Sequence, residues 1–251
     1  MIAAPDLSDA QLDSTLGRTS PVLKLGIAVL FLLVLAFTLE PLPPIVVAVV
    51  VLGAGLVLGG IPSRVLGRSL TPLWIAAAGI TLFNTLFAAA NLDPGATVLA
   101  VIGPLRLTDE GLAAGIGLGL RVVAIASIGA VFALTTDSTR LVDSLVQQAR
   151  VPERFAYGAL AAYQAIPRFG EDLTALRQAR RIRGLRGGWH PRLLVGLLVR
   201  AIRHGDRQAL AMDARAFGMG PRSAYRLVTW SPLDVAVGLG AVTVLVLAVV
   251  V

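Results

Sequence analysis

The stretch GLAAGIGLGLRVVAIASIGAVFAL, residues 111–134, decides the class of fold because it is 24 residues long and contains one charged side chain, Arg121. A bilayer core about 30 Å thick is crossed by roughly 17–25 mostly apolar residues in a helix, so this stretch predicts a transmembrane helix. A charge at membrane depth costs at least about 2.5–3.5 kcal/mol. We therefore expect Arg121 to bond within the helix bundle, to Asp137, to Glu110 or to backbone carbonyls. A place on a proton or substrate path is the alternative.

Four further stretches of the chain are long and apolar enough to cross a bilayer. They are residues 23–39, 43–60, 72–91 and 234–251. Overall 56% of the residues are hydrophobic, more than the roughly 45–50% of ordinary soluble domains. The sequence therefore predicts an all-α integral membrane protein with about five transmembrane helices. A shorter apolar segment, residues 96–105, is too brief to cross, and we expect it to be interfacial or re-entrant.

The basic residues of the short connections predict the orientation of these helices. Arg18 and Lys24 lie at the start of the first span, and Arg64 and Arg68 lie between the second and third. Positive charges in short loops favour the cytoplasmic side. The N-terminus is thus expected in the cytoplasm, and after four crossings the long segment 135–231 is cytoplasmic too. The C-terminus then lies on the extracytoplasmic side of the cell membrane.

The chain accordingly divides into three expected parts. They are the N-terminal tail with the first four transmembrane helices (1–134), a cytoplasmic helical region (135–231) and a C-terminal transmembrane helix (232–251). The cytoplasmic region holds 16 of the 22 basic residues and seven of the 15 acidic residues. Membrane topology and protein docking account for this charge, so no nucleic-acid partner is expected. The chain has no cysteine and two histidines, so no metal site is expected either.

The cytoplasmic region is predicted to consist of four helices in sequence. The first starts after Thr136 or Asp137, the second runs from Pro152 to Ile166, the third from Arg168 to Arg183 and the fourth from Arg192 to Phe217. Caps and prolines set the starts, and Gly184 and Gly218 close the two long helices, the third and the fourth. Small residues spaced four apart, at Ala201, Gly205 and Ala209, predict a close crossing of these two helices. His190 and His204 are expected in a loop and on a helix surface.

Short motifs in a fixed order resemble the T component of energy-coupling factor (ECF) importers, the family that includes EcfT and the cobalt-transport CbiQ proteins. The matching pieces run roughly from residue 20 to residue 230. They are Ser20-Pro21, Lys24-Leu25, LTDEGL (107–112), Arg121, Thr135-Thr136-Asp137, Ile166-Pro167-Arg168, QARRIRG (178–184), AMDARAFG (211–218) and Arg222. The resemblance implies a membrane scaffold that couples two cytoplasmic ABC-type ATPases, a homo- or heterodimer, to a substrate-binding S component for vitamin or transition-metal uptake. ATP and Mg are then bound by the ATPases, and this chain has no cofactor.

The resemblance also implies roles for individual residues. In the family, two coupling helices each carry an X-Arg-X signature that docks into a groove of one ATPase. Here the signatures are Ile182-Arg183-Gly184 and Ala214-Arg215-Ala216, with Arg180 and Arg181 as supporting cations. The second signature is commonly Ala-Arg-Gly, and because alanine forms helix better than glycine, the fourth helix is expected to run further here. Leucines on the two helices are expected to face the S component, and they are Leu173, Leu176, Leu194, Leu197 and Leu198.

Two other classes of function were weighed against this interpretation. The chain has no G-x-x-x-x-G-K-[ST] string, so an ATPase is excluded and energy must come from another chain. A self-contained secondary transporter usually has internal repeats and discontinuous spans, and neither is evident. A membrane enzyme acting on lipid precursors needs clustered carboxylates for a divalent ion, whereas Glu171-Asp172 is a single adjacent pair. No catalytic residue is therefore expected.

Overall fold

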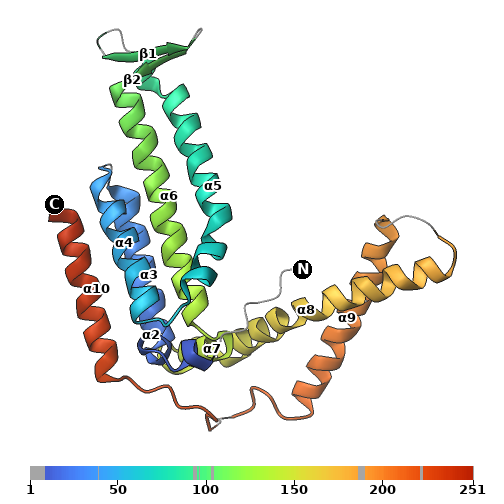
Figure 1. The fold of residues 1–251 in the computed structure, drawn as a ribbon. Helices are drawn as coiled ribbons and strands as arrows, with labels where there is room; N and C mark the ends of the chain where they lie inside the picture. The colour runs from blue at the N-terminus through green and yellow to red at the C-terminus, as the bar shows by residue number, and fades with distance from the viewer. Residues whose placement is uncertain are drawn as a thin grey trace. The chain divides into compact units, whose positions relative to one another are not determined.

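The computed structural model describes most of the chain and divides it into two compact units (Figure 1). Its described residues are 9–38, 40–92, 95, 97–102, 105–185, 190–220 and 223–250. The first unit comprises Leu7–Asp137 and Thr229–Val251, and we call it the apolar unit. The second contains Ser138–Val228, and we call it the arginine-rich unit.

Each of the five predicted apolar stretches forms a helix in the apolar unit. Its helices are α1 (Asp9–Leu12), α2 (Thr15–Arg18), α3 (Pro21–Phe37), α4 (Leu42–Val57), α5 (Ser63–Phe87), the 3-10 turn η1 (Ala89–Leu92), α6 (Asp109–Thr135) and α10 (Pro232–Val250). Within the described residues, α5 and α6 are the two helices long and apolar enough to cross a membrane. Helices α3, α4 and α10 are equally apolar but shorter, with 17, 16 and 19 residues.

Helix α6 is the centre of the apolar unit, and it contacts α3, α4 and α5. Its Ala124 is fully buried, as is Leu35 of α3. Glycines 111, 115 and 119 of α6 are four residues apart. A Cβ at Gly115 or Gly119 would collide with a threonine hydroxyl of α5, so these glycines allow α5 and α6 to approach closely.

Buried polar contacts join the helices at one end of the apolar unit. Lys24 is 8% exposed, and its Nζ donates a hydrogen bond to the Thr135 carbonyl at 2.7 Å. The Asp234 carboxylate is 2% exposed and accepts from the backbone N–H of Ser20 at 2.6 Å and of Ser231 at 2.7 Å. Asp234 therefore binds the first turn of α10 to the start of α3. Helices α3 and α10 begin, and α6 ends, at this same end of the unit.

At the opposite end, α5 and α6 extend beyond α3, α4 and α10 and carry a β-hairpin (Figure 1). Strands β1 (Val98–Ile102) and β2 (Leu105–Thr108) are antiparallel, with Ile102 opposite Leu105 and Val98 opposite Thr108. The segment 96–105, expected to be interfacial or re-entrant, thus contains β-branched residues paired in strands, and its place relative to the membrane stays a prediction. Asn91 secures the junction, since its Oδ1 accepts from the N–H and the hydroxyl of Thr108.

The arginine-rich unit consists of three helices, α7 (Ser138–Gln147), α8 (Glu153–Ile182) and α9 (Pro191–Asp213), and the chain that follows α9. Two helices were predicted where the structure has the single 30-residue helix α8, with Pro167 inside it. Proline removes one helical donor, to the Tyr163 carbonyl, and adds a clash. It does not end α8, which buries Ala156, Leu160 and Ala165 along its length.

Candidate docking site

The first predicted signature forms the C-terminal turn of α8. Ile182 ends the helix and is 87% exposed, and Arg183 is its C-cap. Gly184 follows in the left-handed conformation, with φ of 73°. The N–H of Leu185 donates to the Arg180 carbonyl at 3.2 Å, and that of Gly184 to the Arg181 carbonyl at 3.0 Å. This hydrogen-bonded turn satisfies the last carbonyls of α8 and displays Arg183 on the surface.

The second signature forms the turn after α9. Helix α9 ends at Asp213, and Ala216 is left-handed with φ of 51°. The expectation that Ala216 would prolong this helix to Phe217 was therefore wrong. Helix propensity ranks alanine above glycine only for right-handed backbone, and at this position the turn requires positive φ. Arg215 lies in the turn and is exposed.

The two signatures thus share one backbone arrangement. Each arginine directly precedes a left-handed residue, Gly184 in the first signature and Ala216 in the second. This arrangement turns the chain away from the helix immediately after the arginine. It also gives a physical reason for the third position of the signature, where glycine adopts positive φ without strain. We call the two structures the first arginine turn (182–184) and the second arginine turn (214–216).

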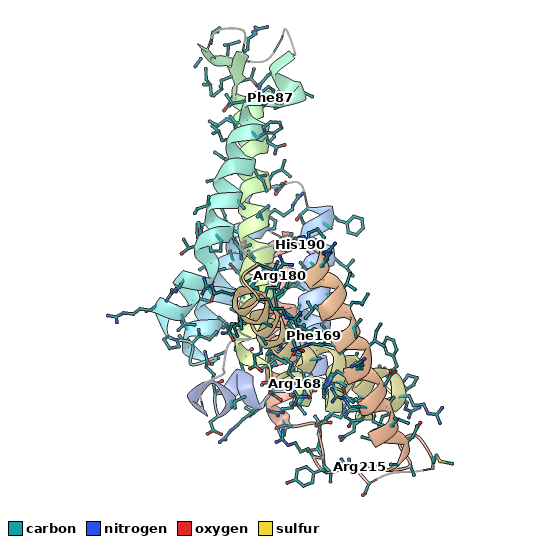
Figure 2. All side chains as sticks on the ribbon, turned by 90° about the vertical axis from the view of Figure 1, so that its right-hand side faces the viewer. Phe87, Arg168, Phe169, Arg180, His190 and Arg215 are labelled. Carbon is teal, nitrogen blue, oxygen red and sulfur yellow. The ribbon has the colours of Figure 1, made fainter. Side chains whose placement is uncertain are left out.

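The two turns lie at opposite ends of an antiparallel helix pair. Successive positions of α9 meet earlier and earlier positions of α8: Gly196 lies against Leu176, and Arg200 pairs with Asp172 at 2.6 Å. Figure 2 shows Arg215 at one end of α9 and His190 at the other, the end where Arg180 of α8 lies. The 23 residues of α9 extend about 35 Å at 1.5 Å per residue. The two arginines are therefore exposed at opposite ends of this helix pair.

Helices α7 and α8 hold the second arginine turn in place. The Arg154 guanidinium donates to the Gly218 carbonyl at 3.0 Å. The rings of Tyr157 and Phe217 meet edge to face, with centroids 6.3 Å apart. The Tyr157 hydroxyl donates to the Asp143 carboxylate at 2.8 Å, and burial, followed by this hydrogen bond, raises the pKa of Tyr157 from 10.0 to about 12. These contacts were not predicted, because no motif links the residues that they join, of which Arg154 and Gly218 are 64 positions apart.

The chain beyond the second turn is also fastened to α7. The Gln147 side chain accepts from the Val228 N–H at 2.9 Å and donates to the Arg226 carbonyl at 2.7 Å. A cleft of about 640 Å³ lies between these elements, and Tyr157, Met212 and Arg215 line it. Arg215 is therefore an exposed residue that lines this cleft.

The first arginine turn has fewer tertiary contacts. Among the described residues, leaving out the neighbouring backbone, no heavy atom lies within 4 Å of the position that a Cβ on Gly184 would take. Of the two predicted supporting cations, Arg181 is exposed and Arg180 is half-buried. The Nε of Arg180 is buried and has no hydrogen-bond partner among the described residues. Of the two supporting cations, Arg180 is thus the one whose Nε–H is left to donate a hydrogen bond to a partner protein.

The predicted crossing through Ala201, Gly205 and Ala209 is not the contact that the structure has. Ala201 is half-buried, but Gly205 and Ala209 are exposed, and a Cβ on Gly205 would have open space around it. Helix α9 meets α8 through a different series of positions, also spaced four apart but one residue earlier in the sequence. They are Gly196, Arg200, His204 and Gln208.

The five leucines expected to face a partner separate into two groups. Leu173, Leu176 and Leu197 are half-buried, and Leu176 packs on Gly196 between α8 and α9. Leu194 and Leu198 are 49% and 60% exposed. Three residues not predicted extend their exposed apolar face along α9, and they are Val195, Val199 and Ile202. Their spacing of three and four residues could have revealed them. We call Leu194, Val195, Leu198, Val199 and Ile202 the α9 apolar face.

Arg121 and His190 have structural partners. The Arg121 guanidinium donates to the Thr38 carbonyl, which is one of the partners expected for it. Thr38 caps α3, so Arg121 lies level with the end of that helix and not midway along it. His190 caps α9, and its Nδ1 accepts from the Arg192 N–H at 3.1 Å. Within the described residues no three His, Cys, Asp or Glu side chains are grouped as metal ligands.

Comparison with known proteins gives one family and several relatives. The family model described as CbiQ, cobalt transport protein, matches residues 13–225. The chain is 28% identical over 173 residues to the energy-coupling factor transporter transmembrane protein EcfT of Streptococcus equi subsp. equi, covering 62% of this chain and 64% of that protein. It is 29% identical over 255 residues to the protein of the same name in Acidaminococcus fermentans, covering 94% of this chain and 91% of that protein.

A further relative is of a different kind. Over 191 residues the chain is 27% identical to a putative ABC transporter ATP-binding protein of Bifidobacterium longum. The match covers 70% of this chain but 23% of that protein. The relative is therefore a much longer polypeptide, of which one part resembles the chain described here.

Proposed function

Because the chain belongs to the CbiQ family of cobalt transport proteins, we propose that this membrane protein is the transmembrane T component of an energy-coupling factor importer. In this role it is a scaffold without catalytic residues. It joins two ABC-type ATPases, a homo- or heterodimer that binds ATP and Mg, to a membrane-embedded S component that binds a vitamin or a transition metal. It passes the nucleotide-driven movement of the ATPases to the S component.

One observation carries the proposal. Two exposed arginines occupy turns of the same backbone conformation, each directly before a left-handed residue. They lie at opposite ends of one antiparallel helix pair, about 35 Å apart by the length of α9. This geometry suits two similar grooves on two separate subunits. A guanidinium pairs bidentately with a carboxylate in such a groove.

The nature of the relatives supports ATPases as the partners. The matched relative in Bifidobacterium longum is named as an ATP-binding protein, and a segment similar to this chain makes up 23% of it. An ATP-binding function and a T-component-like segment thus occur together in one protein. For the present chain, we propose that the ATP-binding protein is a separate subunit that associates with it.

The α9 apolar face is the proposed contact for the S component. Leu194 and Leu198 of this face were expected in that role, and Val195, Val199 and Ile202 join them. Contiguous exposed apolar surface of this kind marks contact with another protein or with membrane. Leu173, Leu176 and Leu197, which were expected in the same role, are half-buried.

Charge supports the proposed sidedness. Residues 135–231 hold 16 of the 22 basic residues, which is typical of a cytoplasmic segment. This segment follows the end of α6 and precedes the start of α10. We therefore place that end of the apolar unit, with the start of α3, at the cytoplasmic face. The C-terminal end of α10 is then extracytoplasmic.

Co-purification tests the docking of ATPases directly. The full-length chain is expressed with its candidate ATPase subunits, extracted in mild detergent and captured by a tag, and the bound ATPase is quantified. Arg183→Glu combined with Arg215→Glu places two carboxylates in the turns, and burying like charges at an interface costs several kcal/mol. We expect the captured ATPase to fall at least tenfold, with membrane insertion unchanged.

The matched control has the same change in net charge at exposed arginines outside the turns. Arg177→Glu with Arg192→Glu, on α8 and α9, meets this condition. The control is expected to capture ATPase as the wild type does. Equal capture by the turn variant and the wild type would overturn the docking of ATPases on these turns.

A further inference from the structure

A cleft between α8 and α9 concentrates cationic and amide side chains without a carboxylate. Its volume is about 480 Å³. Its lining is Ala161, Gln164, Ala165 and Arg168 from α8 and His204, Arg207 and Gln208 from α9. Two guanidinium groups, one imidazole and two amides thus surround a floor of two alanines. Figure 2 shows the position of Arg168 along α8.

The carboxylates of this part of α8 and α9, Glu171, Asp172 and Asp206, line an adjoining cleft. Arg168, His204 and Arg207 line this second cleft too, and within the described residues the ion pair between α8 and α9 there joins Arg200 to Asp172. Arg168 and Arg207 form no ion pair with any described residue. Arg168 of α8 and His204 of α9 line both clefts.

The cleft also fixes the direction of its donors. The Nε of Arg207 donates to the Arg203 carbonyl at 3.1 Å, which orients its guanidinium and leaves the terminal amino groups for another acceptor. Ala165 at the floor is 6% exposed, so one end of the cleft is closed. Donors that converge from both helices onto one space suit a compact anion with several acceptor oxygens.

From this arrangement we propose that the cleft lined by Arg168, His204 and Arg207 binds a phosphate group. Arginine pairs bidentately with phosphate oxygens, and the amides of Gln164 and Gln208 supply neutral donors for the remaining oxygens. The phosphate can come from an anionic phospholipid headgroup or from a free phosphate compound, and the recognising chemistry is the same. Bound between Arg168 on α8 and Arg207 on α9, the group bridges the two helices. Ala161, Gln164 and Gln208 of this cleft also line the cleft beside Arg215, whereas Arg168, His204 and Arg207 do not.

Native mass spectrometry of the full-length chain in non-ionic detergent tests the proposal. The probes are phosphatidylglycerol, phosphatidylcholine and inorganic phosphate, each titrated separately, and the ligand retained per chain is counted. Arg168→Gln with Arg207→Gln removes the two charge-assisted donors. We expect phosphatidylglycerol affinity to fall about tenfold or more, since charged hydrogen bonds contribute at this level. Arg177→Gln with Arg192→Gln, with the same change in net charge elsewhere on the helices, is expected to bind as the wild type does.

A second variant keeps the test independent of folding defects. Gln164→Glu places a carboxylate four residues before Arg168 on the same helix, where it forms a favourable pair. We expect the fold to be retained. Because the new carboxylate competes with phosphate for the Arg168 guanidinium, phosphate binding is expected to fall by a similar factor. If inorganic phosphate displaces phosphatidylglycerol, the ligand is a free phosphate compound. If it does not, the ligand is a lipid headgroup. Equal binding by the wild type, both cleft variants and the control would overturn the site.

Discussion

The two arginine turns reach the same backbone conformation by different means. The first has glycine at its left-handed position, and the space around Gly184 is open. The second has Ala216 there, and its neighbours Phe217 and Gly218 are held by Tyr157 and Arg154 of α8. The first turn is therefore determined by local sequence and the second by tertiary contacts. A strained residue persists where the surrounding structure fixes it.

The largest effect is expected from removing the main support of the second turn. Tyr157→Ala loses the ring contact with Phe217 and the hydrogen bond to Asp143. We expect the free energy of local opening at residues 216–218 to fall by about 2–4 kcal/mol, somewhat below the cost of a fully buried aromatic residue. Hydrogen exchange of these backbone amides in detergent measures it. The amides of the first turn serve as the internal control, and equal loosening of both turns would contradict the comparison.

A smaller effect is expected when the ring is kept and only the hydroxyl is removed. Tyr157→Phe leaves Asp143, which is 8% exposed, without its tyrosine donor. Loss of a hydrogen bond to a charged group costs about 1.5–3 kcal/mol. Thermal unfolding of the detergent-solubilised protein measures the change. An unchanged unfolding temperature would show that the Asp143 contact does not stabilise the second turn.

The same hydroxyl gives a dependence on pH. Because the pKa of Tyr157 is raised from 10.0 to about 12 in the folded protein, folding favours the protonated phenol. This contribution to stability is present below pH 10 and is lost as the pH rises towards 12. The absorbance of tyrosinate should show one of the three tyrosines titrating last, and Tyr157→Phe should remove that step. A wild-type titration with three equivalent tyrosines would contradict the assignment.

In the first turn, the sensitive position is the glycine itself. Gly184→Ala forces an L-residue into positive φ, which costs about 1–2 kcal/mol, partly offset by the lower entropy of the unfolded chain. We expect a net loss of about 1 kcal/mol in stability, measured by thermal unfolding. Gly170→Ala is the matched control, because Gly170 lies inside α8 with open space around it, and alanine there should stabilise slightly. A stabilising effect at both positions would show that the first turn does not require glycine.

The smallest effect, of opposite sign, is expected at the corresponding position of the second turn. Ala216→Gly relieves the strain at φ of 51° but adds entropy to the unfolded chain. We expect a net gain in stability of at most about 1 kcal/mol. The same unfolding measurement detects it. A loss of stability would mean that Ala216 makes contacts that outweigh its backbone strain.

The sequence was sufficient for elements that depend on local composition. Each of the five apolar stretches is a helix, because uninterrupted apolar residues of this length have few other structures that satisfy the backbone. The close approach of α5 and α6 could also have been predicted. The glycines at 111, 115 and 119 are spaced four apart, as in the stripe that was assigned to α9.

Other features depend on contacts that local rules do not contain. Pro167 does not end α8, because the burial of Ala156, Leu160 and Ala165 before it and the packing of Leu176 on Gly196 after it outweigh one lost hydrogen bond. The small residues of α9 do not face α8, because Arg200 pairs with Asp172 and fixes the helices one position away. The arginines of the docking signatures follow from motif resemblance. The residues that hold the second turn, Arg154 and Tyr157, require the tertiary structure.

The position of Asp234 has a consequence for the order in which the protein is made. The ribosome synthesises α3 early, but the buried N–H of Ser20 receives its carboxylate partner only after residue 234 has been added. The whole arginine-rich unit is synthesised in between. Helix α10 also lines an apolar cavity of about 430 Å³, together with Phe31 and Val131. This side of the cavity is likewise formed only after α10 has been synthesised. The apolar unit therefore receives this helix only after the arginine-rich unit has been synthesised.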